Sequence, residues 1–214
     1  MLSFAYKWQG EKKVKTCALP DYPGYPRNLE NDKFLAKDLH RLLDQCDVVI
    51  AHNGDRFDLR KANARFIQHR FRPPSPYRTV DTLKIARQRF KFDSNRLTDL
   101  GQYLGCGKKL PTTGSHLWLS CMAGKRKAWD QMRAYNAQDV VLLEAVYDRL
   151  KGWATNHPNL SHLSRDPIAC PTCESTRTEG KGWKYYATGR KRRRICHGCG
   201  HYFMSGQHEK LDKV

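Results

Sequence analysis

Two pairs of cysteines near the end of the chain constrain its fold most strongly. Four of the eight cysteines form two C-x-x-C pairs with 22 residues between the pairs, namely Cys170 with Cys173 and Cys196 with Cys199. Two such pairs at this distance fit a tetrahedral zinc ion, which thiolates bind well. A redox dithiol is the alternative for a C-x-x-C pair, and His197 or His201 can replace one cysteine as a ligand. We predict a structural Zn²⁺ site held by the four thiolates.

The segment between the two pairs is rich in basic and aromatic residues. Its sequence GKGWKYYATGRKRRRI predicts two strands around a glycine turn, and with the cysteines it resembles a zinc ribbon over about residues 168–206. Basic groups neutralise phosphates, and aromatic faces stack on bases. We therefore predict nucleic-acid contacts from Trp183, Tyr185, Arg190, Arg192, Arg193 and Arg194. In the alternative interpretation the aromatic residues form the small core of the ribbon and the arginine run is a solvated turn.

The charge of the whole chain also indicates a polyanionic partner. The formal net charge is +18 and the sequence pI is about 9.7. Residues 1–164 hold 28 basic against 16 acidic residues, and residues 165–214 hold 11 against 5. Because both parts are basic, we expect both to contact nucleic acid, DNA rather than RNA. A solubilising charge without a specific partner is the alternative.

Composition places the chain among globular proteins. Hydrophobic residues make up 39% of the sequence, which is enough for a packed core. No apolar run approaches the roughly 20 residues that a membrane span needs, and the first residues lack the order of a signal peptide. We expect a soluble, cytoplasmic protein without membrane association.

The pattern of elements predicts an α/β domain followed by a small second domain. We expect the α/β domain at 1–155, a linker at 156–167, the ribbon at 168–206 and a tail at 207–214. The expected order in the first domain is strand, strand, helix, strand, helix, strand, helix, helix. DVVIA is predicted as a buried strand, RTVDTLKIA as a further strand, GKKLPTTGSH as a polar loop and 126–153 as a long helix. Asn31 or Asp32 is expected to cap the first helix.

Two short motifs in the first domain bring carboxylates to the ends or faces of predicted elements. In VVIAHNGDRFD a short apolar strand leads through a polar turn to Asp58, which opens a basic amphipathic helix with Leu59, Ala62, Phe66 and Ile67 on one face. In YNAQD, Tyr135 and Asp139 lie four residues apart on one helix face. Carboxylates placed in this way can converge on divalent metal ions. Taken singly, each motif is also explained by a helix cap or by a surface pair.

Together and in this order, the motifs resemble those of the DEDD (DnaQ-like) 3′→5′ exonucleases of the tyrosine subgroup, over about residues 1–153. The resemblance implies a ribonuclease-H-like mixed sheet flanked by helices and two-metal phosphodiester hydrolysis. It implies that Asp58 and Asp139 bind Mg²⁺ or Mn²⁺ and that Tyr135 positions the attacking water. Asn53 and Phe57 would shape the substrate cleft. The basic side chains of Arg60, Lys108 and Lys109 are further substrate-binding candidates.

The sequence departs from that family in one respect. The family's first motif, Asp-x-Glu on the first strand, does not occur in residues 1–50, so the first strand is expected to be missing. Three explanations are open: Met1 is internal to a longer gene product, the protein is a natural truncation with impaired catalysis, or a partner chain supplies the strand. Asp55 and Asp81 are spare carboxylates, and we expect Asp81 to be structural or to support a metal ligand indirectly.

Three functions therefore compete. The first is a metal-dependent 3′→5′ exonuclease with a zinc ribbon, and the second is a catalytically inactive, nuclease-derived protein that binds DNA or RNA. The third is a transposase-like or transcription-associated zinc-ribbon adaptor. By analogy of layout alone, a small nuclease domain joined to a ribbon is typical of phages and mobile elements.

Overall fold

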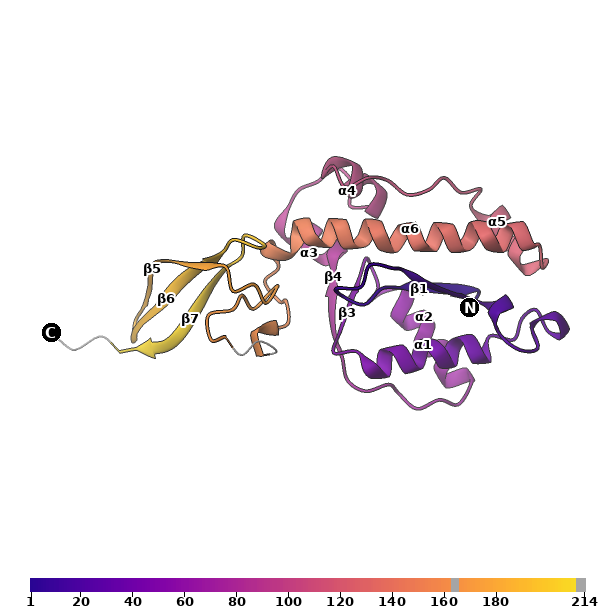
Figure 1. Cartoon of the computed structure of the whole chain (residues 1–214), viewed down its shortest axis with the longest axis horizontal. Coiled ribbons are helices and arrows are strands. Elements are labelled where there is room, and N and C mark those ends of the chain that lie inside the picture. The colour runs from indigo at the N-terminus through magenta and orange to yellow at the C-terminus, as the bar shows by residue number, and fades with distance from the viewer. Residues whose placement is uncertain (163–165, 211–214) are drawn as a thin grey trace.

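The computed structural model describes residues 1–162 and 166–210. An α/β part and a smaller β part lie end to end, and the chain passes from one to the other at the end of the longest helix (Figure 1). Residues 163–165 of the predicted linker and 211–214 of the predicted tail lie outside the described residues. The predicted mixed α/β architecture with a small appended domain is confirmed.

The chain begins with a β-hairpin. Its strands are β1 (Ser3–Tyr6) and β2 (Lys15–Ala18), which pair antiparallel with Ser3 opposite Ala18 and Tyr6 opposite Lys15. The turn contains Gly10 at φ +85°, a conformation that a glycine adopts without steric cost. Two short 3₁₀ turns follow, at Leu19–Asp21 and Tyr25–Arg27. The two strands predicted at the start of the domain are confirmed.

A second, parallel pair of strands follows the first helix. Strands β3 (Val48–Ala51) and β4 (Arg78–Asp81) are joined through α2 (Asp58–Gln68), and α1 (Lys33–Gln45) precedes them. Among the described strands, β1 pairs only with β2 and β3 pairs only with β4. The sheet of the α/β part is thus divided into two pieces, and one edge of β1 and one edge of β3 are left without a strand partner.

Four helices complete the α/β part. They are α3 (Thr82–Arg89), α4 (Leu97–Tyr103), α5 (Ser115–Met122) and α6 (Arg126–Leu150). With 25 residues, α6 is about 37 Å long and runs along the whole α/β part (Figure 1). A short 3₁₀ turn, Lys151–Trp153, prolongs it. No described helix is long and apolar enough to cross a membrane.

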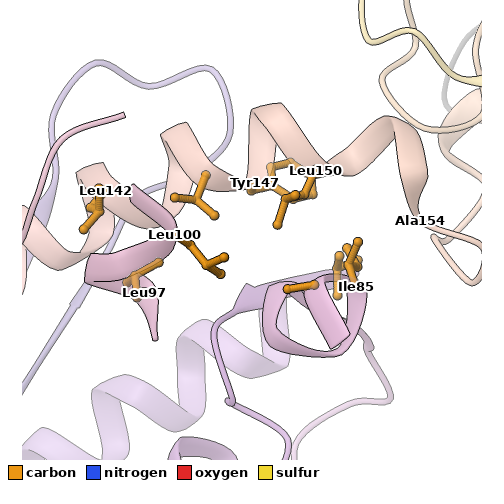
Figure 2. Packing of buried hydrophobic residues seen from close by; sticks show 10 residues of the cluster. Ile85, Leu97, Leu100, Leu142, Tyr147, Leu150 and Ala154 are labelled. Carbon is orange, nitrogen blue, oxygen red and sulfur yellow. The ribbon is translucent and has the colours of Figure 1, made fainter. Parts of the chain in front are cut away.

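The long helix α6 joins two separate hydrophobic cores. Near its start, Trp129 and Met132 pack with Leu19 of the first 3₁₀ turn and Leu35 of α1. Near its end, a second cluster forms against α3 and α4; its members include Ile85, Leu97, Leu100, Leu142, Tyr147 and Leu150 (Figure 2). A third core lies between α1 and α2. One helix with two buried segments therefore fixes the relative position of most other elements.

The small β part is a three-stranded antiparallel sheet. Its strands are β5 (Thr178–Tyr186), β6 (Gly189–Cys196) and β7 (Tyr202–Glu209). The two strands predicted around a glycine turn are confirmed. The third strand continues to Glu209, into the stretch predicted as a tail. His201 Nδ1 hydrogen-bonds the backbone carbonyl oxygen of Gly152 at 2.9 Å, which ties the ribbon to the end of α6.

Two expectations about elements are wrong. RTVDTLKIA is not one strand, because β4 ends at Asp81 and α3 begins at Thr82; the Asp81 carboxylate accepts the Leu83 N–H at 3.0 Å and caps the helix. The stretch from Ser115 to Met122 is a helix that the sequence reading missed. Both errors concern short apolar runs, for which periodicity does not separate strand from helix.

Burial differs from expectation at two more places. Ile67 was expected on the buried face of α2, but it is 77% exposed, since the helix packs through Ala62 and Phe66. Strand β3 was expected to be buried and is only half-buried along its length. Its unpaired edge faces a cavity, and this explains the exposure.

Candidate active site and metal centre

The two predicted carboxylate motifs meet at one cavity of about 590 Å³. Asp58 enters it from the first turn of α2, and Asp139 enters it from the middle of α6. Lys109, from the loop between α4 and α5, also lines the cavity. The cavity extends between β1 and β3, so the site lies at the end of β3, in the gap between the two sheets.

Asp139 is held by a lysine on one oxygen only. Its Oδ2 accepts a hydrogen bond from Lys109 Nζ at 2.7 Å, and its Oδ1 is buried without a hydrogen-bond partner within the described part of the chain. Lys109 Nζ also donates to the Tyr135 hydroxyl at 3.3 Å and lies 5.4 Å from the centre of the Tyr135 ring. Burial opposes the charge of Lys109, but Asp139 and Tyr135 raise its pKa. Tyr135, Lys109 and Asp139 therefore form one connected unit.

Asp58 lines the same cavity. Its side chain is exposed to solvent, but nearby protein groups exclude part of the water around it. This partial desolvation raises the pKa of Asp58, and the negative charge of Asp81 raises it further. The positive charge of Lys109 acts in the opposite direction. A cation between Asp58 and Asp139 would offset the desolvation of the first and satisfy the free oxygen of the second. The donor set of the cavity thus fits a hard divalent cation.

The turn between β3 and α2 is fixed by Asp81 and His52. Asn53 has a left-handed backbone, with φ +64°, and its N–H donates to Asp81 Oδ1 at 2.8 Å. Because the same oxygen accepts the Leu83 N–H, Asp81 is a structural residue, as expected from the sequence. His52 bonds Thr82 Oγ1 at 2.9 Å and the Asn95 carbonyl at 3.0 Å, and burial lowers its pKa. Sequence reasoning missed His52, although it directly precedes Asn53.

Of the remaining predicted substrate residues of this domain, Phe57, Arg60 and Lys108 are exposed and lie outside the lining of the cavity. Phe57 is 57% exposed, with Lys61 Nζ 5.9 Å from the centre of its ring. Arg60 and Lys108 are exposed as well. Lys109 is not free on the surface, because Asp139 and Tyr135 hold its ammonium group. Phe57, Arg60 and Lys108 are therefore sequence neighbours of residues that line the cavity, without lining it themselves.

The four cysteines of the ribbon come together as a ligand set. The Sγ atoms of Cys170, Cys173, Cys196 and Cys199 all lie within 4.8 Å of one another. The Cys170–Cys199 and Cys173–Cys196 sulfurs are 3.7 and 3.6 Å apart. A tetrahedron with Zn–S distances of about 2.3 Å has edges of about 3.8 Å. The sulfurs thus have the spacing that zinc requires, and their short contacts run between the two pairs rather than within one redox dithiol.

Neighbouring groups support this assignment. The amide of Thr172 donates to Cys170 Sγ at 3.4 Å, and the amide of Gly198 donates to Cys196 Sγ at 3.2 Å. Burial opposes ionisation of Cys196, but the backbone amides of Cys199 and Gly198 and the neighbouring thiols lower its pKa to about 7. Burial raises the pKa of the Cys170 and Cys199 thiols. The two histidines that could have replaced a cysteine bond elsewhere, His197 to Glu179 and His201 to Gly152. Four thiolates can hold the zinc ion without them.

The predicted nucleic-acid residues of the ribbon divide between its two faces. Trp183 pairs with Arg192, and Tyr185 pairs with Arg190, so these four side chains share one face. The Arg190 and Arg192 guanidinium carbons lie 4.3 and 5.2 Å from the centre of the Trp183 ring. Arg194 follows on the same face by alternation, whereas Arg193 lies on the other.

The aromatic residues of this face are not the core of the ribbon. The buried cluster consists of Cys170, Cys196 and Phe203, with Cys173 and Cys199 packed against it. Tyr185 is 62% exposed. The alternative in which these aromatics form the core is therefore wrong, and we name this surface, made of Trp183, Tyr185, Arg190, Arg192 and Arg194, the ribbon face.

The α/β part matches a known family. The model of the RNase_H superfamily matches residues 6–151, which run from β1 to the end of α6 and include Asp58, Tyr135 and Asp139. The chain belongs to the RNase_H superfamily. No curated protein matches it. The RNase_H superfamily match supports a nuclease-like function on nucleic acid, and the RNase H-like fold typically uses divalent metal ions, in agreement with the carboxylates of the cavity.

Proposed function

We propose that the protein is a metal-dependent 3′→5′ exonuclease of the DEDD type, and that its zinc ribbon binds the nucleic-acid substrate. One observation carries the proposal: a buried oxygen of Asp139 has no partner in the described structure, in a cavity that Asp58 also lines. Lys109 connects this carboxylate to the hydroxyl group of Tyr135. A buried polar atom without a hydrogen bond is costly unless a ligand satisfies it. The cavity belongs to the part of the chain that matches the RNase_H superfamily.

The residues of the site have distinct proposed roles. Asp58 and Asp139 would hold Mg²⁺ or Mn²⁺. When bound, such ions stabilise the attacking and leaving oxygens of phosphodiester hydrolysis. Tyr135 would orient the attacking water through its hydroxyl group, which Lys109 holds on the same side as Asp139.

The surroundings of the site are assigned to the substrate. Asn53 would shape the cleft at the end of β3, Phe57 would contact a base, and Arg60 and Lys108 would contact phosphates. The ribbon face would neutralise further phosphates and stack on a base through Tyr185. We assign the substrate as DNA rather than RNA, and the cytoplasm as the place of action.

One observation favours a second candidate function, a catalytically inactive protein that binds DNA or RNA. Lys109 already places a positive charge beside Asp139, on Oδ2, and so offsets the negative charge that would attract a metal ion to the other oxygen. Within the described residues, the cysteines are the only group of three or more ligating side chains close enough to hold one ion. Two carboxylates alone bind Mg²⁺ weakly, because the ion needs six oxygen ligands.

Digestion of end-labelled oligonucleotides distinguishes the two functions. Single-stranded DNA and RNA, labelled at the 5′ or the 3′ end, are incubated with the protein and Mg²⁺ or Mn²⁺. We expect stepwise shortening from the 3′ end. We expect Asp139→Asn to lower the rate by more than about 100-fold, beyond what loss of an outer-shell partner costs. The exposed Asp130 lies on the same helix, so Asp130→Asn is the matched control and should keep the rate.

Binding of the same oligonucleotides is measured in parallel by fluorescence anisotropy without divalent metal. Retained binding with no digestion by the unsubstituted chain would overturn the exonuclease proposal and support the inactive binding protein. Equal digestion by Asp139→Asn and the unsubstituted chain would show that the site assignment is wrong.

A further inference from the structure

The gap between the two sheets has backbone groups on both sides. Each strand of a sheet offers N–H and C=O groups on two edges. In the described part of the chain, β1 uses one edge for β2, and β3 uses one edge for β4. The cavity of about 590 Å³ is lined by residues of both strands, Ser3 to Tyr6 and Val48 to Ala51. The two unpaired edges thus face the same space, which we name the slot.

The slot has apolar residues on both of its other sides, although Asn136, Glu144 and Asp148 of α6 also line it. Leu39, Leu43 and Leu59, from α1 and α2, line one side. Val140 and Leu143, from α6, line the other. A strand between two helical layers is covered on both faces, and such strands are continuous runs of apolar residues, often β-branched. The apolar part of the lining therefore has the chemistry that surrounds a central strand of an α/β sheet.

We propose that the slot binds an extended apolar strand of a separate polypeptide, which joins the two sheets into one by pairing with β1 and β3 together. Addition of a strand to an exposed sheet edge is a general mode of peptide recognition, in which backbone hydrogen bonds supply affinity and side-chain pockets supply specificity. Here two edges would take part. β1 and β3 each have four residues, so the bound strand would span about 13 Å.

The direction of the strand follows from the directions of its neighbours. Ser3 of β1 is bonded to Asn136, and Lys7 just beyond β1 is bonded to Glu144, so β1 runs along α6 in the same direction. The end of β3 leads to Asp58, and Asp58 and Asp139 share the cavity and the charge of Lys109. β1 and β3 therefore run in opposite directions. A bound strand that is parallel to β3 would add a third parallel strand to β3 and β4. The same strand would be antiparallel to β1 and would add a third antiparallel strand to β1 and β2.

A second copy of this chain does not suit the slot. Its described strands are already paired within their own sheets, and the exposed strands of the ribbon are rich in charged residues. The described strands of this chain thus do not supply the occupant, and we assign it to a separate polypeptide with a run of apolar residues. Its C-terminal end would lie beside Asp58 and Asp139, where an oxygen-bearing side chain could add a ligand to the metal site. That last point alone rests on the proposed function; strand binding does not.

Hydrogen–deuterium exchange with a synthetic peptide tests the proposal in the absence of divalent metal. The probe has a short core of alternating valine and isoleucine, flanked by serines for solubility. The control peptide has the same length and sequence except for one proline in the core, which cannot pair on both edges. We expect the probe, and not the control, to slow exchange of the amides of both β1 and β3. Protection of neither strand, or of only one, overturns the proposal.

Two neighbouring valines on α6 provide matched variants. Val140 lines the slot, whereas Val141 is 47% exposed and is not part of its lining. Val140→Arg should weaken peptide binding about tenfold or more, because a long charged side chain would replace an apolar one where the strand packs. Val141→Arg should leave the affinity unchanged. Equal affinities of the two variants, measured by anisotropy of a labelled peptide, would contradict binding in the slot.

The source of the strand is tested by fusion of the same peptide core ahead of β1 through a flexible linker. Protection in the fusion together with binding of the separate peptide supports the proposal. Protection in the fusion alone, with no binding of the separate peptide, overturns the assignment to a separate polypeptide. Because none of these readouts involves hydrolysis, an inactive metal site would not affect them.

Discussion

Asp32 illustrates how a single buried charge organises the first domain. It occupies the N-cap position of α1, as predicted, but its side chain makes no capping hydrogen bond. The fully buried carboxylate instead accepts from Arg65 Nε at 2.6 Å and bonds His69 Nε2 at 2.7 Å, both on or beside α2. It also pairs with the α-amino group of Met1. The expected cap is thus a link between α1 and α2.

This link predicts a strong, pH-dependent effect of Asp32→Asn. Burial opposes ionisation, but the hydrogen bonds from Arg65, Met1 and His69 hold the pKa of Asp32 well below its usual range. A depressed carboxyl pKa stabilises the fold above the unfolded value of about 3.9, and this stabilisation is lost as the pH falls below it. We expect Asp32→Asn to lower the free energy of unfolding at pH 7 by about 3–5 kcal/mol.

Urea unfolding at a series of pH values measures the effect. The difference between Asp32→Asn and the unsubstituted chain should shrink as the pH falls below about 4. Asp130→Asn, at an exposed position of α6, is the control and should change stability much less. A difference that stays constant down to the lowest pH would contradict the role of the Asp32 charge.

The contact between α4 and α6 shows, at the scale of elements, why a glycine occupies a helix interior. A Cβ on Gly101 would lie 2.6 Å from Leu142 Cδ1 and 2.7 Å from the Gly107 carbonyl oxygen. The second neighbour is backbone and cannot turn aside. Gly101 lies inside α4 and is buried. Glycine has a lower helix propensity than alanine, but its lack of a Cβ allows α4 to pack closely on α6.

We therefore predict that Gly101→Ala destabilises the protein, although alanine is the better helix former. Overpacking of a core typically costs about 1–3 kcal/mol, and replacing glycine by alanine in a helix gains about 1 kcal/mol. Because the Cβ would meet a backbone oxygen, we expect the overpacking cost to be the larger of the two. Thermal unfolding should show a lower Tm for Gly101→Ala. The neighbouring Gln102 is exposed, so Gln102→Ala should keep or raise the Tm. A raised Tm for both variants would disprove the close contact.

The elements that could be predicted are those whose pattern is long or chemically unambiguous. The period of α6 continues over 25 residues, and the cysteine spacing admits few alternatives. The start of α3 could not be predicted, because it depends on Asp81 capping the helix while it also holds the Asn53 amide of another loop. Likewise, Asp58 and Asp139 could be predicted from local motifs. The hydrogen bond from Lys109 to Asp139 could not, because it depends on the path of the loop between α4 and α5.

At the scale of the whole molecule, the ribbon is anchored through one close backbone contact. A Cβ on Gly152 would lie 2.2 Å from the Cys199 carbonyl oxygen, and the same glycine accepts the hydrogen bond from His201. Cys199 also belongs to the ligand set of the predicted zinc site. The predicted zinc site therefore lies against the end of α6. We expect loss of the metal to disrupt the contact between the ribbon and this helix.

Zinc removal should unfold the ribbon and leave the α/β part folded. The ribbon has a very small core, so the metal supplies most of its folding free energy. With a chelator, hydrogen–deuterium exchange should become fast in β5, β6 and β7 and stay slow in α6. Cys170→Ser should have the same effect, whereas Cys106→Ser, outside the ligand set, should not. An unchanged exchange pattern and no zinc by elemental analysis would refute the metal site.

The unbroken α6 also gives the molecule an internal ruler. Asp139 and the end of the helix at Leu150 are separated by about 16 Å along a rigid axis. At 3.4 Å per nucleotide of a B-form strand, this length corresponds to about five nucleotides. The ribbon lies beyond this end of the helix (Figure 1). If the proposed exonuclease shortens a nucleic acid at Asp139 while the ribbon binds it, the length of the helix would contribute to the size of the last fragment that the protein holds.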